Sequence, residues 1–505
     1  MPILPPSAFA FCGPTYLGIS PVIDAERSIN LFPELEIGSA KSQIALIGRA
    51  GMSATPFITL PTSPLQAFWV GANRLFVVAG ATVYELNPNG TIKTNYGGYP
   101  YLLNEGPVYF QANSAGTQLI MCPAGAGQIF NVAAGPPPVI QQVTTTGVGA
   151  GFYGIALEYL DGFFITIARA ASLQTASPNQ INVSNLEDGT MWDPLNYVVR
   201  SGSSDQVIAL AVLNSLLWIF GERTIEIWYD AGNPLFPLAR MQGGTINLGC
   251  LAAASVVKFY NTIMWAGADA TGYCQIYMTQ GLGPIPVSTP AIENLINQTP
   301  AFELPLMWAY AEQTGGHTFY VLNICNSAYQ PTATYVYDLR TGLWHERVYG
   351  AAAWPVCFAS APGFVYPTGD AVGNFVGDGQ SSGNIYFSSL TYPSDGGTAI
   401  NYTRTAPVIN KANIRLKFPR FELDCDIGTA QPQLSYSNNG GRSFNPWSYP
   451  LQQAQDQSAP GTFRRFYARQ LGQARNRVYK VTISDSANLI RIINAYASVE
   501  PGTES

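Results

Sequence analysis

The sequence predicts an all-β fold: a β-propeller of six or seven irregular blades, followed by a C-terminal β-sandwich-like domain. Only 11% of the 505 residues are charged, whereas Gly (49), Pro (37), Tyr (28) and Phe (25) are numerous. Few charges, many turn formers and many aromatic residues are typical of short strands joined by tight turns. Apolar residues at helical spacing are nearly absent, and the two exceptions are residues 291–297 and 302–310.

A weak repeat of paired apolar strands indicates the propeller. Each unit is an apolar strand, a tight turn and a second apolar or aromatic strand, as in RLFVVAGATVYEL (74–86). Equivalent positions are spaced by 44, 44, 54, 46, 56 and 56 residues, at Leu75, Leu119, Phe163, Leu217, Ile263, Phe319 and Phe375. A period of about 40–50 residues is typical of propeller blades, which bury their faces only against neighbouring blades.

Changes of pattern along the chain predict four parts. Residues 1–60 are a Pro-rich, irregular arm with the first strands, and residues 61–392 are the propeller. Residues 393–407 are expected to be a polar connector. Residues 408–505 contain further strand-like runs bounded by turn formers and are expected to form the β-sandwich.

The charge is distributed unevenly. Residues 404–505 contain 13 of the 25 Lys and Arg but 7 of the 31 Asp and Glu, a balance of +6, which leaves −12 for residues 1–403. An acidic body and a basic end favour contacts between subunits, and a surface with few charges is typical of assemblies. The acidic balance argues against tight DNA binding by the body, because such binding needs a basic patch against the phosphates.

No pattern in the sequence indicates a catalytic, metal or cofactor site. The seven Cys are scattered without a CxxC pair, and His317 and His345 have no evident partner, so we expect reduced thiols and assembly in a cytoplasm. No Ser-His-Asp order, GxSxG or P-loop is present. The N-terminus lacks the pattern of a signal peptide, and the apolar run 210–220 is too short to cross a bilayer, so we expect no membrane insertion.

Several stretches, in order, resemble the packaged-DNA stabilisation (tail hub or nozzle) proteins of short-tailed bacteriophages. SPVIDAERSINLFPE (20–34) is similar to the opening motif of that family, with Phe32 where Tyr is usual. FGERTIEIWYDAGNPLFPL (220–238) and GCLAAASV (249–256) follow in the middle of the chain. YARQLGQARNRVYKVTISD (467–485) resembles part of the C-terminal module.

The resemblance implies a structural virion protein and not an enzyme. Its subunits are expected to form a ring, as a hexamer, that retains packaged DNA in the virion tail and conducts it during ejection. The implied partners are copies of the same chain, the adaptor protein near the portal, tail fibre or spike proteins, and double-stranded DNA that passes without specific binding. The alternative is a carbohydrate-active propeller, either a sialidase-like hydrolase or a receptor-binding lectin.

Three groups of residues are candidates for a site. SNNGGRSF (437–444) resembles the Asp-box, a hairpin in which Ser437, Asn439, Gly441 and Phe444 are expected to be structural. The arginines Arg464, Arg465, Arg469, Arg475 and Arg477 are a candidate inter-subunit interface, favoured over a nucleic-acid site because tight phosphate binding would obstruct ejection. Glu222 and Glu226 are candidate channel-lining residues, and nothing in the sequence places them as a catalytic pair.

Overall fold

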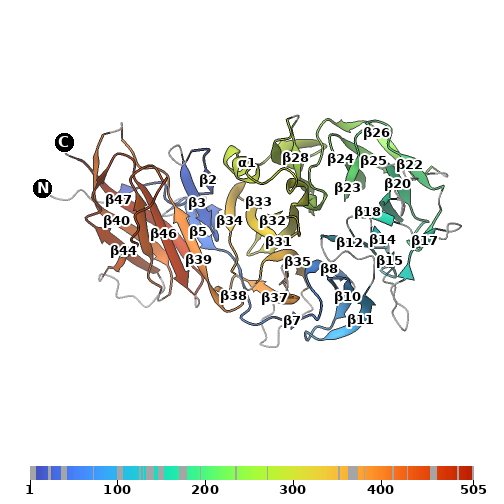
Figure 1. Cartoon of the computed structure of the whole chain (residues 1–505), viewed down its shortest axis with the longest axis horizontal. Coiled ribbons are helices and arrows are strands. Elements are labelled where there is room, and N and C mark those ends of the chain that lie inside the picture. Colours follow the sequence, from blue (N-terminus) through green and yellow to red (C-terminus); the bar gives the residue numbers. More distant parts are fainter. Residues whose placement is uncertain are drawn as a thin grey trace.

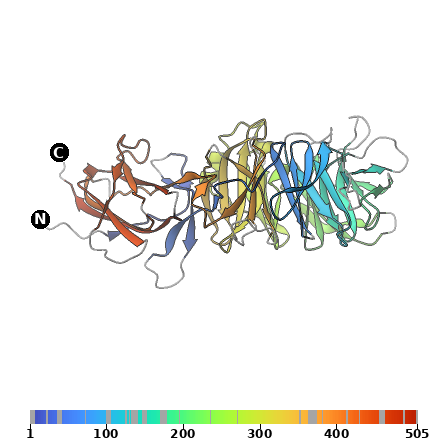
Figure 2. The same ribbon diagram turned by 90° about the horizontal axis from the view of Figure 1, so that it is seen from below.

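The chain forms an elongated molecule with a ring of sheets at one end and a two-layer β structure at the other, where both termini lie (Figures 1 and 2). The computed structural model describes residues 7–20, 24–35, 42–71, 73–98, 106–123, 127–128, 130–131, 141–145, 153–169, 179–193, 195–233, 236–269, 271–350, 353–361, 374–379, 382–411, 414–428, 430–454, 463–485 and 488–502.

Five consecutive antiparallel sheets form blades of a propeller. Their strands are β8 (Leu65–Gly71), β9 (Arg74–Ala79), β10 (Thr82–Leu86) and β11 (Ile92–Gly98); β12 (Val108–Ala112), β13 (Leu119–Pro123), β15 (Phe130–Asn131) and β16 (Gln141–Gln142); β14 (Gly127–Gln128), β18 (Tyr153–Leu160), β19 (Phe163–Arg169), β20 (Gln180–Val183) and β22 (Tyr197–Val199); β23 (Val207–Leu213), β24 (Leu216–Gly221), β25 (Ile225–Asp230) and β26 (Leu238–Ile246); β27 (Val257–Phe259), β28 (Thr262–Ala268), β29 (Cys274–Gln280) and β30 (Gly283–Pro286). The short strands β17 (Thr144–Thr145) and β21 (Met191–Trp192) pair in parallel.

Two further sets of strands continue the ring and connect it to the N-terminal segment. They are β31 (Trp308–Thr314), β32 (His317–Cys325), β33 (Pro331–Asp338) and β34 (Leu343–Arg347), followed by β35 (Pro355–Ser360), β36 (Asn374–Asp378) and β37 (Asn384–Ser389). β34 pairs with β3 (Ala25–Ile29), and β37 pairs with β6 (Gly51–Met52) and β7 (Ile58–Thr59). Strands from the start of the chain thus complete the last sheet of the ring.

Six of the seven repeat positions lie on the second strand of a sheet, from Leu75 on β9 to Phe375 on β36, and Phe163 lies on β19, the third strand of a five-stranded sheet. The predicted all-β propeller arrangement is therefore confirmed. Two-residue turns at 161–162, 214–215 and 315–316 lead into the strands that carry three of these positions, and both central residues have positive φ in each turn. Such turns match the twist of a hairpin and favour Asn, Asp and Gly, which explains Asp161, Gly162, Asn214 and the Gly315-Gly316 pair.

Apolar side chains between neighbouring sheets form the core of the propeller. Trp218 and Phe220 of one sheet, for example, pack with Trp265 of the next. The ring closes where the β35–β37 sheet meets the first sheet, and the side chains at this contact are Val356, Phe375, Phe387, Leu75, Val77 and Tyr84. Each sheet thus has an apolar face on both sides and needs two neighbours.

The two-layer region consists of two facing sheets. One contains β3, β39 (Thr398–Thr405), β46 (Val478–Asp485), β41 (Gln433–Ser437) and β42 (Tyr449–Pro450), with β2 (Tyr16–Leu17) and β38 (Ser394–Asp395) at its margins. The other contains β4 (Leu31–Leu35), β5 (Ile44–Gly48), β47 (Arg491–Pro501), β40 (Leu416–Asp426), β44 (Phe463–Arg469) and β43 (Gln452–Gln453), with β1 (Ser7–Ala8) and β45 (Gln473–Ala474). Leu31, Phe421 and Tyr479 lie in the shared apolar core.

Two expectations from the sequence are corrected here. The connector expected at 393–407 is a strand-forming segment, because Ile400 and Tyr402 alternate into the core and β39 pairs with both β3 and β46. The helix candidate at 302–310 forms only the short 3-10 turn η2 (Leu304–Leu306), which contains Pro305, before β31 begins.

Helical structure is scarce in the described part. The helix expected at 291–297 is present as α1 (Pro290–Ile296), where the Thr289 side chain accepts a hydrogen bond from the Ile292 amide. The other 3-10 turn is η1 (Ala253–Ser255). With seven residues in its only described α-helix, the described chain has no helix long enough to span a bilayer.

Removal of the Phe57 ring is expected to destabilise the closed propeller. Phe57 precedes β7, and its ring centroid lies 5.0 Å from that of Phe375 and 4.9 Å from that of Phe387. Phe57→Ala should lower the free energy of unfolding by about 3–5 kcal/mol, measured by urea denaturation. The matched control is Phe302→Ala, because Phe302 is 70% exposed, and it should change stability by less than about 0.5 kcal/mol. Equal effects of the two substitutions would contradict closure by the N-terminal strands.

Candidate functional site

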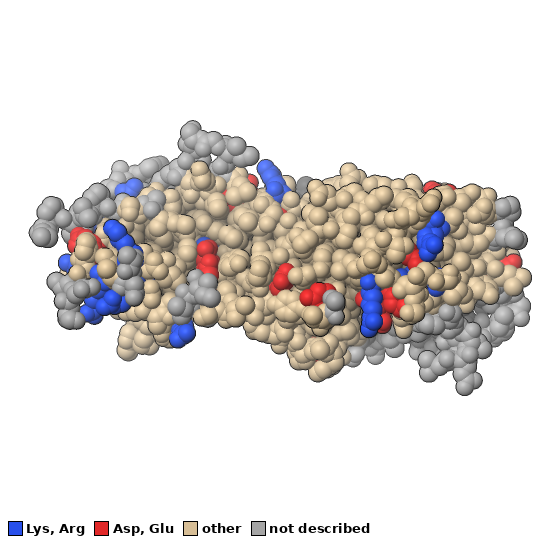
Figure 3. Space-filling view, turned by 90° about the horizontal axis from the view of Figure 1, so that it is seen from above, with Lys and Arg blue, Asp and Glu red and all other residues tan. Residues whose placement is uncertain are grey.

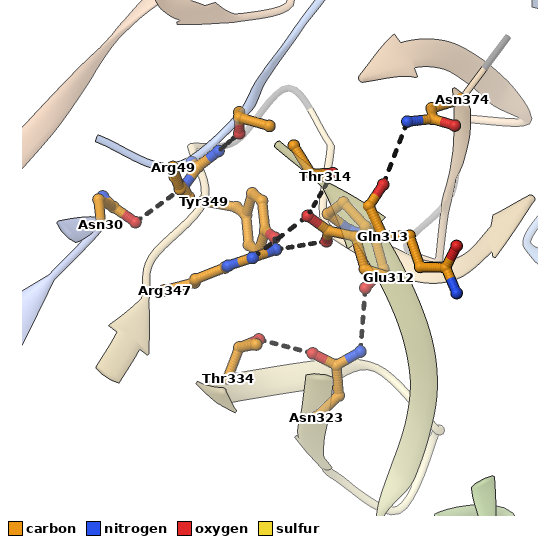
Figure 4. A network of polar contacts seen from close by, with 12 residues as sticks. Asn30, Arg49, Glu312, Gln313, Thr314, Asn323, Thr334, Arg347, Tyr349 and Asn374 are labelled. Atoms are coloured by element: carbon orange, nitrogen blue, oxygen red, sulfur yellow. Dashed lines mark hydrogen bonds and ion pairs between the residues drawn. The ribbon is translucent and has the colours of Figure 1, made fainter. Parts of the chain in front are cut away.

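A buried ion pair lies at the seam between the propeller and the two-layer region (Figure 4). Arg347 on β34 contacts Glu312 on β31 with an Nη1–Oε2 distance of 2.5 Å, and both side chains are 2% exposed. The guanidinium also lies over the Phe319 ring, 5.1 Å from its centroid. Burial lowers the pKa of Arg347, but the nearby Glu312 carboxylate has a larger opposite effect, so that the pKa is raised. The seam therefore contains a charged pair in apolar surroundings.

A second buried arginine ties the N-terminal segment to this seam. Arg49, between β5 and β6, donates to Asp395 Oδ1 (3.0 Å) and to Asn30 Oδ1 (2.9 Å). Its guanidinium lies 4.3 Å from the centroid of the Tyr349 ring. Asn30 has a φ of +61°, which Asn tolerates better than most residues, and its side chain also accepts from the Val348 amide. One arginine thus connects three segments that are distant in the sequence.

His317 links the two parts of the molecule through two carboxylates. Its Nε2 lies 2.6 Å from Glu34 Oε2 on β4, and its Nδ1 lies 2.8 Å from Asp338 Oδ2 on β33. Carboxylate oxygens accept hydrogen bonds, so these two contacts favour the protonated ring, in which both nitrogens donate. Burial lowers the pKa of His317, but the bonds to Asp338 and Glu34 outweigh burial, so that the pKa is raised.

His345, in contrast to His317, has no described partner for its ring nitrogens and is uncharged. It is fully buried on β34, and neither ring nitrogen has a hydrogen-bond partner within the described part of the chain. Burial and the charge of Arg347 lower the pKa of His345 well below its usual value, so that this ring is neutral. The charged groups described at the seam pair with one another, and the unpaired His345 ring is fully buried, so the arrangement is suited to holding two parts of the chain together.

A cavity of about 320 Å³ lies on the axis of the propeller, inside its innermost strands β12, β18, β23, β27 and β31. Small residues such as Ala156, Ala209 and Ala211 line it, because the strands approach one another closely there. Its charged groups are Glu158 and Lys258, which pair at 3.0 Å. Burial raises the pKa of Glu158, against the effect of Lys258. The described wall thus offers a single carboxylate, whereas a glycosidase needs two.

The Asp-box-like hairpin is held by its own side chains. Ser437 Oγ accepts from the Gly441 amide at 2.9 Å, and Asn439 Oδ1 accepts from the Ser443 amide at 3.0 Å. Gly441 has a φ of +93°, and the half-buried Phe444 ring lies 4.4 Å from Lys480 Nζ. These bonds are local, and the hairpin offers no described ligand pocket.

The structure separates the five candidate interface arginines. Arg477 is fully buried between the rings of Phe418 (4.4 Å) and Tyr436 (4.2 Å), and its side chain donates to the Leu471 carbonyl. Arg477 is therefore an internal residue and cannot form an interface, which corrects the expectation. The other four, Arg464, Arg465, Arg469 and Arg475, are at least partly exposed.

Arg464 and Arg465 have acceptors within the same sheet. Arg465 Nε lies 3.3 Å from Asp424 Oδ1, and Arg464 Nη1 donates to Gln453 at 2.9 Å. Arg469 lies over the Tyr467 ring, 5.0 Å from its centroid. Asp424 thus offsets the charge of Arg465, whereas the neutral amide of Gln453 only occupies one donor of Arg464.

The two candidate channel residues also differ. Glu222 is exposed at the turn before β25. Glu226 is completely buried on β25, where it pairs with Arg200 (Nε–Oε1 3.2 Å) and accepts from Trp228 Nε1 (3.0 Å). Glu226 therefore does not line a channel, which corrects the expectation, and it is not positioned to act with Glu222.

Sequence reasoning missed the buried network at the seam. Its signal is nevertheless present, because charged residues are rare in this chain and Glu312 and Arg347 interrupt apolar strands, in WAYAEQT (308–314) and LWHER (343–347). An isolated charge in an apolar strand indicates a buried partner. The sequence gives no distance between the two partners, which are 35 residues apart.

Comparison with known proteins gives one family match. The family model described as "Bacteriophage P22 Gp10, beta-propeller" matches residues 66–359, which is more than half of the chain. Among solved structures, the N-terminal domain of Nup159 matches with a TM-score of 0.40 and 10% identity, over 72% of this chain and 99% of that one. An exo-β-1,3-galactanase from Phanerochaete chrysosporium matches with a TM-score of 0.29 and 8% identity, over 89% and 100%. A search of curated protein sequences gives no significant match.

Glu312→Gln is expected to destabilise the seam strongly, because it leaves the charge of Arg347 buried without compensation. The free energy of unfolding should fall by about 3 kcal/mol or more in urea denaturation. Glu500→Gln is the matched control, since Glu500 contacts Lys417 only at 3.9 Å on the surface, and its effect should be below about 1 kcal/mol. A Glu312→Gln protein as stable as the control would refute the structural role of the pair.

His317→Gln is expected to lower the free energy of unfolding by an amount that depends on pH. The pKa of His317 is raised in the folded state, so its stabilisation is complete below the unfolded value of about 6.5 and is lost as the pH rises through the folded value. The difference in unfolding free energy between wild type and variant should therefore be largest in mild acid and should shrink in mild alkali. Urea denaturation at several pH values measures it, and a difference that does not vary with pH would exclude the imidazolium.

Proposed function

This chain belongs to the bacteriophage P22 Gp10 β-propeller family, and on that premise we propose that it is a tail nozzle or hub subunit of a short-tailed phage. Copies would form a ring, as a hexamer, that retains packaged DNA and conducts it during ejection. The observation that carries the proposal is the family match over residues 66–359, which covers most of the propeller.

The DNA channel would lie between subunits and not inside one propeller. The axial cavity of the propeller has a volume of only about 320 Å³ and contains the ion pair of Glu158 and Lys258. A duplex is far wider, because its major groove alone is about 12 Å across. A ring of several copies is the arrangement that leaves a hole of sufficient width.

The charge distribution supports passage without binding. Lys and Arg are sparse on the face seen in Figure 3, and most of the described surface there is uncharged. The body of the chain, residues 1–403, has a balance of −12. Tight DNA binding depends on Lys and Arg that neutralise phosphates and release counterions from the DNA. A neutral or acidic wall releases none and is therefore expected to bind DNA weakly. Exposed Glu222 is retained as a candidate for such a wall.

We propose seven blades and a sandwich for each subunit. The sets β31–β34 and β35–β37 would be the sixth and seventh blades, the seventh completed by β6 and β7. The propeller would consist of residues 61–392 together with β6 and β7, and the sandwich of residues 408–505 together with β3, β4, β5 and β39. Closed rings require two unlike faces on each subunit, and the partly exposed Arg464, Arg465, Arg469 and Arg475 remain candidates for one of them.

The other partners follow from the place of the protein in the tail. The adaptor near the portal would contact one face of the ring, and fibre or spike proteins would attach outside. The subunits would assemble in the host cytoplasm, and the seven Cys, all free thiols in the structure, suit a reducing compartment.

Negative-stain electron microscopy of the purified chain, alone and with its adaptor, tests the proposal. We expect rings with a central hole wider than a DNA duplex. A protein that stays monomeric in both preparations would refute the ring. Incubation with neutral and acidic glycans, followed by product analysis, tests the hydrolase alternative, and cleavage would favour it.

The ring is also expected to bind double-stranded DNA weakly at physiological ionic strength. A gel-shift titration at two salt concentrations measures the affinity and its dependence on salt. Strong binding that falls steeply with salt would indicate many phosphate contacts and would contradict a channel wall that binds DNA only weakly.

A further inference from the structure

We propose that a cleft on one face of the propeller binds a neutral oligosaccharide. The cleft has a volume of about 400 Å³ and lies where the turn between β31 and β32 meets β36, β37 and the turn between β27 and β28. Its lining residues are Tyr260, Gln313, Thr314, Gly315, Gly316, His317, Thr318, Asn374, Ser389 and Leu390. The cleft adjoins the seam, because His317 lines it and also pairs with Glu34 and Asp338, but it is separate from the axial cavity. The proposal does not depend on ring formation.

The chemistry of the lining selects a neutral, hydroxyl-rich ligand. Two amide side chains, Gln313 and Asn374, and three hydroxyl side chains can both donate and accept hydrogen bonds, as sugar hydroxyls do. Asp, Glu, Lys and Arg are absent from the described lining, and His317 is already paired with Glu34 and Asp338, so the lining itself offers no unpaired charge to a charged ligand. A few convergent polar groups in a concave site are typical of small-molecule recognition.

An exposed aromatic ring at the rim provides the apolar contact. Tyr260, in the turn after β27, is 78% exposed, although a ring of this size is usually covered. A tyrosine ring offers a rigid apolar face and a polar hydroxyl, which suits the C–H face and the hydroxyls of a sugar ring.

The floor of the cleft is preorganised. Asn374 Nδ2 donates to the Gln313 carbonyl at 3.3 Å, which holds the β36 and β31 edges together, and Figure 4 shows these two residues on neighbouring strands. Gly315 has a φ of +60°, and a Cβ there would lie 2.7 Å from Leu390, so a larger residue would crowd the cleft. The exposed side chain of Gln313 is therefore presented from a fixed backbone.

The site is suited to binding and not to cleavage. Its titratable groups are His317, whose two nitrogens are committed to Glu34 and Asp338, and the phenol of Tyr260. Cleavage of a glycosidic bond normally uses two carboxyl groups separated by about 5–9.5 Å, and the described lining provides none.

An array of neutral oligosaccharides, with acidic glycans included, tests the proposal, followed by calorimetric titration of the strongest neutral binder. We expect at least one neutral oligosaccharide to bind without being cleaved, and acidic glycans to bind more weakly. Tyr260→Ala and Gln313→Ala should each weaken binding at least tenfold, and because both side chains are exposed, thermal unfolding should be unchanged.

The matched controls are Tyr273→Ala and Gln280→Ala, exposed residues outside the cleft, which should bind within twofold of wild type. The proposal is overturned if no neutral oligosaccharide binds, if acidic glycans bind more tightly, or if either cleft substitution leaves the affinity unchanged. Each of these results leaves the proposed ring intact, because imaging tests the ring separately.

Discussion

The structure depends on the packing of sheets that are apolar on both faces. A sheet such as β23–β26 has Leu217 and Ile219 on one face and Trp218 and Phe220 on the other, and each pair is buried against a different neighbour. Such a sheet is stable only between two others, so the series must close on itself. Contact between the β35–β37 sheet and the first sheet provides that closure. β6 and β7, from the start of the chain, then pair with β37 of the last sheet and hold the ring closed.

The same N-terminal segment also connects the propeller to the two-layer region. β3 pairs with β34 of the propeller and with β39 of the two-layer region, so one hydrogen-bonded sheet crosses the seam. The buried pair of Arg347 and Glu312 lies at this seam, and His317 connects Glu34 to Asp338 across it. Buried ionic groups add little net stability but are costly to separate.

The features that the sequence predicts well are those set by local patterns. The spacing of apolar strand pairs located a central strand in each sheet of the propeller, and the Ser437 hairpin could be described from its turn residues alone. The features that it predicts poorly depend on partners distant in the chain. Arg477 and Glu226 look like surface charges in strands, yet aromatic rings surround the first and Arg200 neutralises the second. The pairing of β3, β6 and β7 with late strands has no local signal, because it depends on the closed ring.

We propose that DNA passes between copies of the subunit and not through the propeller of any one copy. Cryo-electron microscopy of DNA-filled virions measures this directly, because the duplex and the subunits are visible in one map. The account predicts duplex density on the axis of a ring of subunits, with each propeller axis free of DNA. Duplex density inside a propeller, or the absence of this chain from a ring around the DNA, would contradict it.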